Sequence, residues 1–445
     1  MTSASTEQVS PKTLRKVIVA AAIGNFVEWF DFAVYGFLAT TIAQQFFPSG
    51  DSGAALLKTF AVFAVAFAFR PLGGIFFGML GDRIGRKRTL AMTILLMAGA
   101  TTLIGVLPTY AAIGVVAPIL LTLIRCAQGF SAGGEYAGAC AYLMEHAPND
   151  KRAWYGSFLP VSTFSAFAAA AVVAYALEAS LSAEAMGSWG WRLPFLIAAP
   201  LGLVGLYLRW KLDETPAFQA VKEEHAVAHS PLKETLRNHG AAICCLGAFV
   251  SLTALSFYMF TTYFATYLQV AGGLSRATAL LVSLIALIFA AAICPLAGLF
   301  SDRVGRRATV VTACALLIVA VYPSFLMASS GGFAASIVGV MLLAIGAVLC
   351  GVVTAALLSE TFPTRTRYTA SAITYNMAYT LFGGTAPLVA TWLISTTGSN
   401  LSPAFYLIAV ALLALAGGLA LPETSRISLH DVAPQGKGAR VAAAR

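Results

Sequence analysis

Long runs of apolar residues alternate with short polar breaks along the chain from Val17 to Leu421. Each run is apolar on all sides rather than at every second position, and most are long enough to cross about 30 Å of hydrocarbon as an α-helix. A β-barrel would need alternation with a period of two, so the pattern excludes it. The sequence therefore predicts an all-α membrane protein.

Twelve such runs are present. They lie near residues 17–43, 56–80, 88–107, 112–144, 154–178, 191–210, 240–270, 276–300, 308–328, 332–359, 368–395 and 403–421. Composition agrees with this interpretation, because 59% of the 445 residues are hydrophobic and only 11% are charged. The mean hydropathy of +0.80 is far above that of water-soluble domains.

The distribution of positive charge predicts the orientation of the helices. Lysine and arginine near helix ends are retained on the cytoplasmic side. If the N-terminus is cytoplasmic, 23 of the 28 lysines and arginines fall in cytoplasmic segments. We therefore expect both termini to be cytoplasmic in a bacterial inner membrane. The formal charge of +9 then reflects topology and not a nucleic-acid surface.

Three motifs occur twice, in the same order. The pairs are Gly78–Lys87 with Gly298–Arg307, Glu145 and Arg152 with Glu360 and Arg367, and residues 213–215 with 422–424. Such internal repetition indicates that a unit of six helices has been duplicated. The predicted domains are a cytoplasmic N-terminus (1–16), a first six-helix bundle (17–210), a cytoplasmic linker (211–239), a second six-helix bundle (240–421) and a cytoplasmic tail (422–445).

The repeated G-x-x-x-D-R-x-G-R-[KR] loop and the paired E-x6-R motifs resemble those of the major facilitator superfamily. Four further strings resemble its metabolite:proton symporter branch: GNFVEWFDFAVYG at 24–36, FRPLGG at 69–74, RCAQGFSAGGEY at 125–136 and WGWRLPF at 189–195. That branch includes permeases for α-ketoglutarate, citrate, shikimate, and proline or betaine. The resemblance implies proton-coupled symport by alternating access, with two pseudo-symmetric bundles rocking about a central site.

Ionisable side chains inside the predicted spans indicate where the solute and the proton bind, because charges at membrane depth are retained mainly where they have a partner or a task. These side chains are Glu28, Asp31, Arg70, Arg125 and Glu135. Depth along each helix, at about 1.5 Å per residue, predicts the ion pairs Arg125–Asp31 and Arg70–Glu135 and leaves Glu28 near the midplane. Each pair also has a purely structural interpretation.

A coupling mechanism follows from this arrangement. The five charges sum to minus one, so a single bound proton would neutralise them. We predict that Asp31, Glu28 or Glu135 carries the proton. Protonation of a carboxylate would release its arginine for a bidentate contact with a substrate carboxylate. The five histidines all fall in predicted cytoplasmic segments and are excluded as the membrane proton carrier.

The predicted solute contacts come from both halves. They are Arg125, Arg70, Gln128, Tyr35, Tyr258, Tyr263 and Asn376. For most of the aromatic run at 257–267, packing or lipid contact is the alternative. Two buried arginines favour a small di- or tricarboxylate as solute. The alternative is a zwitterion such as proline or glycine betaine, which would use one arginine for its carboxylate and aromatic rings for its cation.

Charged residues at the cytoplasmic edge are predicted to act as latches between the halves. The predicted gating residues are Asp82, Arg83, Arg86, Glu145, Arg152, Asp302, Arg303, Arg306, Glu360 and Arg367. We expect Arg86 to pair with Glu145 and Arg306 with Glu360. Asp82 and Asp302 would then bridge the halves. The alternative is that these cations only set the topology.

Other function classes lack their motifs. Neither G-x-x-x-x-G-K-[ST] nor H-E-x-x-H is present, so an ATP-driven pump or a zinc enzyme is not indicated. A channel and an osmosensor are further alternatives. The seven cysteines lie in predicted spans without metal-ligand spacing. We expect no enzymatic activity, cofactor, metal or nucleic-acid partner. The partners are the solute, protons and the lipid bilayer, and a monomer is expected to suffice.

Overall fold

The structure of the protein is a computed structural model. It describes residues 11–425 and 427, apart from 50, 85, 135, 137–139, 141–142, 145–146, 211–230 and 363–366. The side chains of 11–17, 20–21, 78–90, 134, 208–238 and 367–369 also lie outside the described set. Every regular element within the described residues is helical.

The first half of the chain contains the following elements: α1 (Pro11–Phe37), α2 (Ala39–Phe46), α3 (Ser52–Ala68), α4 (Arg70–Ile84), α5 (Arg86–Val106), α6 (Tyr110–Ile113), α7 (Val116–Ser131), η1 (Ala132–Gly134), α9 (Arg152–Gly156), α10 (Phe158–Ser180), α11 (Ala183–Ser188), η2 (Gly190–Arg192) and α12 (Leu193–Trp210). The second half contains α14 (Pro231–Tyr258), η3 (Met259–Tyr263), α15 (Phe264–Val270), α16 (Arg276–Val304), α17 (Arg306–Ser329), α18 (Phe333–Glu360), α19 (Arg367–Ala378), η4 (Tyr379–Gly383), α20 (Ala386–Thr397) and α21 (Ser402–Leu419).

When elements separated by short breaks are grouped, they correspond to the twelve predicted spans. Nine helical segments within the described residues are long and apolar enough to cross a membrane, and the bent pair of α1 and α2 makes a tenth. The third and fourth predicted spans correspond to the shorter apolar stretches Ala91–Val106 and Val116–Ser131.

Four spans are interrupted within the described residues. The first bends by 63° between α1 and α2. The second breaks at Phe69, just before Pro71, whose ring nitrogen has no hydrogen to donate to a helical bond. The seventh and eleventh spans contain the π-helical turns η3 and η4. Turns of this kind are frequent at functional sites.

Two helices begin earlier than predicted. α1 starts at Pro11 rather than near residue 17, and α14 starts at Pro231 rather than near residue 240. The end of the predicted linker at 211–239 is therefore helical. Hydropathy marks where a chain becomes apolar, whereas a helix continues into polar sequence wherever its side chains can be solvated.

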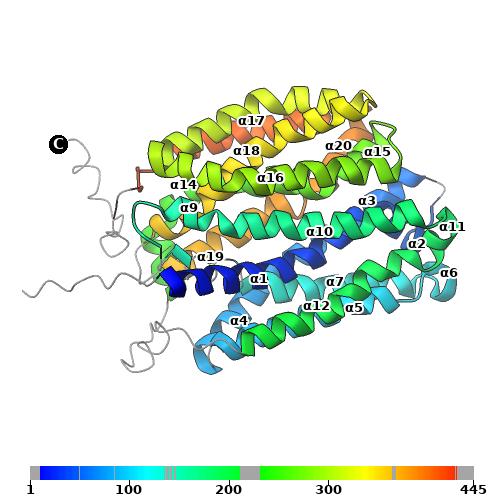
Figure 1. Ribbon diagram of the computed structural model, residues 1–445, viewed down its shortest axis with the longest axis horizontal. Coiled ribbons are helices and arrows are strands. Elements are labelled where there is room, and N and C mark those ends of the chain that lie inside the picture. The colour runs from blue at the N-terminus through cyan, green and yellow to red at the C-terminus, as the bar shows by residue number, and fades with distance from the viewer. Residues whose placement is uncertain are drawn as a thin grey trace, which may run out of the picture.

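The helices run side by side along the long axis of the molecule and form two bundles (Figure 1). In the first bundle, α1 packs against α10 and α12, and α12 packs against α5. In the second, α18 and α21 pack against α17, and α14 packs against α19 and α21. The bundles meet chiefly through α9 and α10 with α16 and through α3 with α20. We call the end at which α1 begins and α21 ends the terminal end.

Glycines bring the second and fourth spans into backbone contact. A β-carbon at Gly129 would overlap the carbonyl oxygen of Ala66, and one at Gly73 would overlap that of Phe130. Only glycine allows so close an approach. This crossing holds Arg70, at the start of α4, against the end of α7.

Candidate substrate and proton site

Arg70 lies at the break in the second span, and its side chain is fully buried. Its Nη2 lies 3.6 Å from Oε1 of Glu28 on α1 and 3.4 Å from the carbonyl oxygen of Ala132. Its Nε and Nη1 have no hydrogen-bond partner among the described residues. Arg70 is therefore a cation with a nearby counter-charge and with donors left over for a further acceptor.

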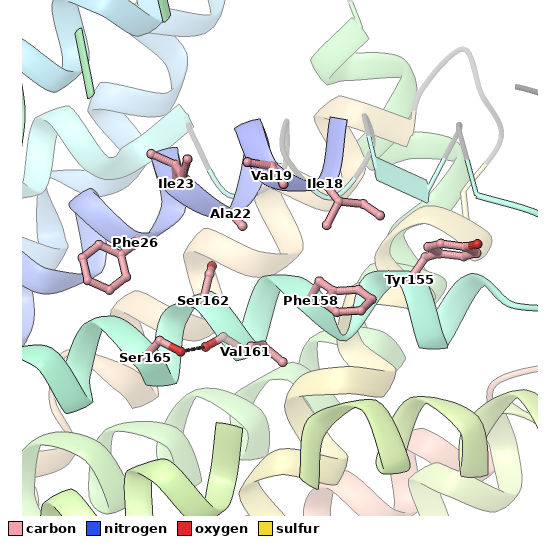
Figure 2. Close-up of a pocket in the computed structure, with 10 residues that line it drawn as sticks. All are labelled: Ile18, Val19, Ala22, Ile23, Phe26, Tyr155, Phe158, Val161, Ser162 and Ser165. Carbon is pink, nitrogen blue, oxygen red and sulfur yellow. Dashed lines mark hydrogen bonds between the residues drawn. The ribbon is translucent and has the colours of Figure 1, made fainter. Parts of the chain in front are cut away.

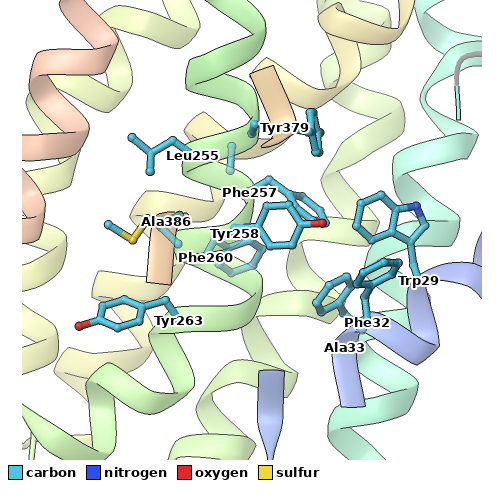
Figure 3. Close-up of a cluster of buried hydrophobic side chains, with 14 of the residues drawn as sticks. Trp29, Phe32, Ala33, Leu255, Phe257, Tyr258, Phe260, Tyr263, Tyr379 and Ala386 are labelled. Atoms are coloured by element: carbon cyan, nitrogen blue, oxygen red, sulfur yellow. The ribbon is translucent and has the colours of Figure 1, made fainter. Parts of the chain in front are cut away.

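Aromatic rings from both halves surround this guanidinium group. Its central carbon lies 5.9 Å from the ring centre of Trp29, 5.6 Å from that of Phe32 and 5.3 Å from that of Phe67. The Phe257 ring of α14 lies 5.1 Å from Trp29, and the Tyr258 ring lies 5.2 Å from Phe67. Figure 3 shows the rings of the two halves facing one another. Such faces attract a cation.

Arg125 on α7 forms a second buried cluster, within the first half. Its Nη1 donates a 2.7 Å hydrogen bond to Gln128, whose amide nitrogen donates to the Thr101 hydroxyl at 2.5 Å. The guanidinium carbon lies 4.2 Å from the ring centre of Tyr35. The Tyr35 hydroxyl donates to the carbonyl oxygen of Thr59 at 3.0 Å. Gln128 and Tyr35, both predicted to contact the solute, thus hold the arginine in place.

Asp31 lies beside the Arg125 cluster and is 1% exposed. Neither of its carboxylate oxygens accepts a hydrogen bond from the described residues. The neighbouring Thr101 hydroxyl donates instead to the carbonyl oxygen of Met97 at 3.0 Å. A neutral carboxylic acid needs fewer partners in such surroundings than a carboxylate ion does. The position is suited to hold a proton.

The buried charges are paired differently from the sequence prediction. Arg70 lies against Glu28, which the prediction left unpaired, and its predicted partner Glu135 lies outside the described residues. The predicted ion pair between Arg125 and Asp31 is absent from the described part of the chain. The prediction measured depth along straight helices from their apolar boundaries. The early start of α1 and the break in the second span shift those depths.

Two residues of the second half that were predicted to contact the solute make other contacts instead. Asn376 on α19 donates to the carbonyl oxygen of Gly133 at 3.0 Å and so joins the two halves. Tyr263 in η3 packs on Phe60 with ring centroids 6.0 Å apart. In Figure 3 it points away from Tyr258. Tyr263 therefore lies outside the rings around Arg70.

A groove of about 620 Å³ lies between α1 and α10, toward the terminal end (Figure 2). Its lining is apolar except for one tyrosine and two serines: Ile18, Val19, Ala22, Ile23, Phe26, Tyr155, Phe158, Val161, Ser162 and Ser165. The buried arginines and acids do not line it. No group of three or more histidine, cysteine or acidic residues within the described residues is placed to hold a metal ion.

A charged network joins the halves at the terminal end. Arg306 lies 3.0 Å from Glu360, as the sequence predicted, and 2.9 Å from Asp302. Glu360 also lies 3.3 Å from Arg152 of the first half. Asp302 accepts hydrogen bonds from the backbone N–H groups of the two residues after Arg152, at 3.0 and 2.9 Å. Asp302 and Glu360 therefore connect the two bundles directly.

Glu423, just beyond α21, caps the start of α17. Its carboxylate accepts hydrogen bonds from the backbone N–H groups of Arg306, Arg307 and Ser425 at 2.8, 3.0 and 2.9 Å. Burial alone would raise the pKa of this carboxyl, but these donors outweigh it and hold the pKa below its usual value. Glu423 is thus ionised at neutral pH, and its stabilising effect is lost only as pH falls through that lowered pKa.

The segment after α21 also reaches the first half. The Thr424 hydroxyl donates to Glu360 at 2.8 Å, and the carbonyl oxygen of Ile427 accepts a 2.9 Å hydrogen bond from Arg152. Sequence reasoning did not assign these residues to the gate. The repeated Glu-Thr string at 423–424 was a signal, but its spacing along the chain does not show what it meets in space.

The other predicted gating residues are outside this network. Arg303 is exposed and forms no ion pair within the described residues. The side chains of Asp82, Arg83, Arg86, Glu145 and Arg367 lie outside the described set. The pairing of Arg86 with Glu145 stays a prediction.

A smaller contact joins the halves at the opposite end. Nη1 of Arg276, at the start of α16, lies 3.7 Å from a carboxylate oxygen of Glu178 on α10. The same nitrogen donates to the hydroxyl of Thr41 on α2 at 3.2 Å. Polar contacts therefore join the bundles on both sides of the buried arginines.

Replacing Asp302 by alanine should open the terminal end without weakening solute binding, because Asp302 bonds the other half and does not touch the central rings. Its two hydrogen bonds to the other half, each worth roughly 1.5–3 kcal/mol, are lost together with its ion pair to Arg306. We expect at least about a tenfold faster reaction of a cysteine introduced at the interface near Trp154 with a thiol reagent. The exposed neighbour Arg303→Ala is the control. Equal reactivity in the two variants would rule out a latch at Asp302.

Comparison with known proteins places the site in context. Residues 21–387 match the sequence profile of the Major Facilitator Superfamily. The chain is 39% identical to the glycine betaine/proline/ectoine/pipecolic acid transporter OusA of Dickeya dadantii (strain 3937), over 95% of this chain and 86% of that protein. It is 38% identical to the proline/betaine transporter of Salmonella typhimurium, with the same coverage. It is also 38% identical to the ectoine/proline transporter ProP of Corynebacterium glutamicum, over 94% and 86%.

The fold is similar to that of solved transporter structures. The proton:xylose symporter XylE bound to 6-bromo-6-deoxy-D-glucose superposes with a TM-score of 0.74 at 18% identity, over 95% of this chain and 99% of that one. XylE from E. coli in a partially occluded inward-open conformation gives 0.70 at 18% identity, over 93% and 99%. At this identity the similarity concerns the fold alone. It confirms the predicted arrangement of twelve helices in two bundles.

Proposed function

We propose that this chain, which belongs to the Major Facilitator Superfamily, carries a small zwitterionic solute of the proline or betaine class across a membrane together with protons. Its family and relatives are transporters, so the protein is a transporter and not an enzyme. The solute would bind between the bundles and be exposed to one side at a time.

The observation that carries the proposal is the position of Arg70 between the halves. Its unused Nε and Nη1 can donate to a solute carboxylate. The Tyr258 hydroxyl of the second half is buried and also has no hydrogen-bond partner among the described residues. The rings of Trp29 and Phe257 then offer faces to the cationic end of the same solute.

The charge balance favours a zwitterion over the di- or tricarboxylate preferred from the sequence. The acids Glu28, Asp31 and Glu135 outnumber Arg70 and Arg125 by one negative charge, and one bound proton brings this set to zero. A neutral zwitterion leaves this balance unchanged, whereas a dianion adds two uncompensated charges at low dielectric. The relatives, named for proline, betaine and ectoine, support the alternative that the sequence left open and not the carboxylate.

Asp31 is the proposed proton carrier. It lies in the first half, beside Arg125. The Phe32 ring lies 5.6 Å from the guanidinium carbon of Arg70 and 5.4 Å from that of Arg125, so proton and solute occupy adjoining clusters. Protonation of Asp31 would change the field on Arg125 and Glu28, and through Glu28 on Arg70. Proton binding at Asp31 would thus be coupled electrostatically to solute binding at Arg70.

The remaining features of the proposal follow from the sequence. We propose a bacterial inner-membrane location with both termini cytoplasmic, which makes the terminal end the cytoplasmic end. The functional unit would be a monomer with bundles at 17–210 and 240–421, and the linker and tail would be cytoplasmic. The networks around Glu360 and Arg276 would then be inner and outer gates.

A binding and uptake assay tests the solute class. Purified protein should be stabilised against heat by glycine betaine or proline and not by citrate or α-ketoglutarate, because binding to the folded state adds about 2.7 kcal/mol at a hundred times Kd. In proteoliposomes, an inward proton gradient should drive betaine uptake and an uncoupler should abolish it. Stabilisation and uptake with the carboxylates alone would overturn the proposal.

A further inference from the structure

We propose that Asn25 is a positioning residue. It orients the indole of Trp29 so that the face of the ring contacts the cationic end of the solute. The inference rests on the proposed function, because it concerns a solute with a cationic end. It adds a residue that neither touches the solute nor carries a charge.

Asn25 is buried on α1, one turn before Trp29. Its amide oxygen accepts a 3.0 Å hydrogen bond from the indole nitrogen of Trp29. Its amide nitrogen donates to the hydroxyls of Ser162 and Thr163 on α10, at 2.7 Å each. The amide therefore connects the indole to the neighbouring helix.

The direction of each hydrogen bond in this chain is determined by chemistry. An indole nitrogen can only donate, so the amide oxygen must face Trp29. The hydroxyls of Ser162 and Thr163 donate to the carbonyl oxygen of Leu159 at 2.9 and 3.2 Å, which leaves their lone pairs for the amide nitrogen. The Asn25 amide can satisfy all its partners in one orientation only.

The oriented ring faces the proposed solute site. The Trp29 ring lies 5.1 Å from Phe257 and 6.2 Å from Tyr258 of the second half, and 5.9 Å from the guanidinium carbon of Arg70. Without the Asn25 acceptor, the indole N–H would be buried and unpaired, which costs about 1–3 kcal/mol. The ring would rotate to find another acceptor, and its face would leave the site.

The effect should depend on the solute. A quaternary ammonium has no N–H, so its cationic end is recognised by ring faces alone. The ammonium of proline carries two N–H groups and can also be held by hydrogen bonds. Misplacement of Trp29 should therefore weaken betaine binding more than proline binding.

The test compares Asn25→Ala with the wild-type protein in proteoliposomes. We expect the KM for glycine betaine to rise about tenfold and the KM for proline by about threefold or less, with little change in the maximal rate. In a Trp29→Phe background, which lacks the indole N–H, Asn25→Ala should have almost no further effect. A residue that only stabilises the helix contact would instead add the same loss in both backgrounds.

Ser165→Ala is the matched control, because its hydroxyl lies on the same helix and donates only to the carbonyl oxygen of Val161, as Figure 2 shows. If Asn25→Ala does not reach the membrane, the pair Ser162→Ala with Thr163→Val removes the hydroxyls that accept from the Asn25 amide nitrogen and so releases the amide that orients Trp29. Equal rises in KM for betaine and proline, or additive losses in the Trp29→Phe background, would overturn the role of Asn25. Wild-type protein that transports neither solute would instead contradict the proposed function.

Discussion

Replacing Asp31 by asparagine is expected to abolish solute accumulation driven by a pH gradient, while exchange of labelled for unlabelled solute continues. Asparagine resembles the protonated acid in shape and cannot release a proton. The carboxylate oxygens of Asp31 accept no hydrogen bond from the described residues, so this buried position can accommodate a neutral side chain. Binding and the rocking of the bundles should therefore survive, and only the coupling should be lost.

The size of this effect follows from the driving force. A gradient of one pH unit is worth about 1.4 kcal/mol per proton and supports a tenfold accumulation at one proton per solute. Uptake by the variant should stop once the solute concentrations inside and outside the proteoliposomes are equal. The proteoliposomes must contain the same amount of protein as those of the wild type. Glu184→Gln, an exposed acid on α11, should accumulate solute normally. If Asp31→Asn still accumulates solute, the carrier is Glu28 or Glu135 instead.

Replacing Arg70 by lysine should weaken solute binding by about 30- to 100-fold, because lysine keeps the charge but loses the planar pair of donors that binds a carboxylate. The retained charge still faces Glu28, so the variant should fold. Arg192→Lys is the control, since Arg192 donates to the backbone carbonyl groups of Gly105 and Leu107, lies over the Trp191 ring, and takes no part in the rings around Arg70. Equilibrium binding of labelled betaine or proline measures both variants.

The comparison with Arg125→Lys separates the two buried arginines. The sequence predicted that both Arg125 and Arg70 contact the solute. In the structure each arginine has two nitrogens without a hydrogen-bond partner among the described residues. Arg125 is bonded to Gln128 and stacked on Tyr35 in its own half, whereas the Trp29 ring beside Arg70 contacts Phe257 of the other half. Arg125→Lys should therefore disturb coupling more than binding. A larger loss of binding in Arg125→Lys than in Arg70→Lys would assign the solute carboxylate to Arg125 instead.

Much of the fold could be predicted because its signals are local. The apolarity and length of each run suffice to predict that it lies in lipid, so the number and order of the spans follow directly from the sequence. The repeated loop motifs likewise indicate, from the sequence alone, that a six-helix unit has been duplicated. Helix starts were less accurate, as the early beginning of α14 at Pro231 shows. A helix can extend beyond the apolar segment from which it is predicted.

The terminal network was predicted in part. Arg306 and Glu360 were paired correctly because both lie in repeated motifs at helix ends on one side of the membrane. The contacts of Asp302 with backbone N–H groups and of Arg152 with Ile427 were not, since backbone groups carry no signature in sequence.

The sequence by itself determined the all-α fold, the twelve spans, the transporter class and the list of buried ionisable residues. These depend on the free energy of burying each segment in hydrocarbon, which is a sum over neighbouring residues. Only the tertiary structure decided that Arg70 meets Glu28, that Arg125 stays within its own half, and that Asn25 orients Trp29. These contacts depend on the bends at Leu38 and Phe69 and on the glycine crossing of two spans. Such geometry arises from packing between segments distant in sequence, which no local pattern encodes.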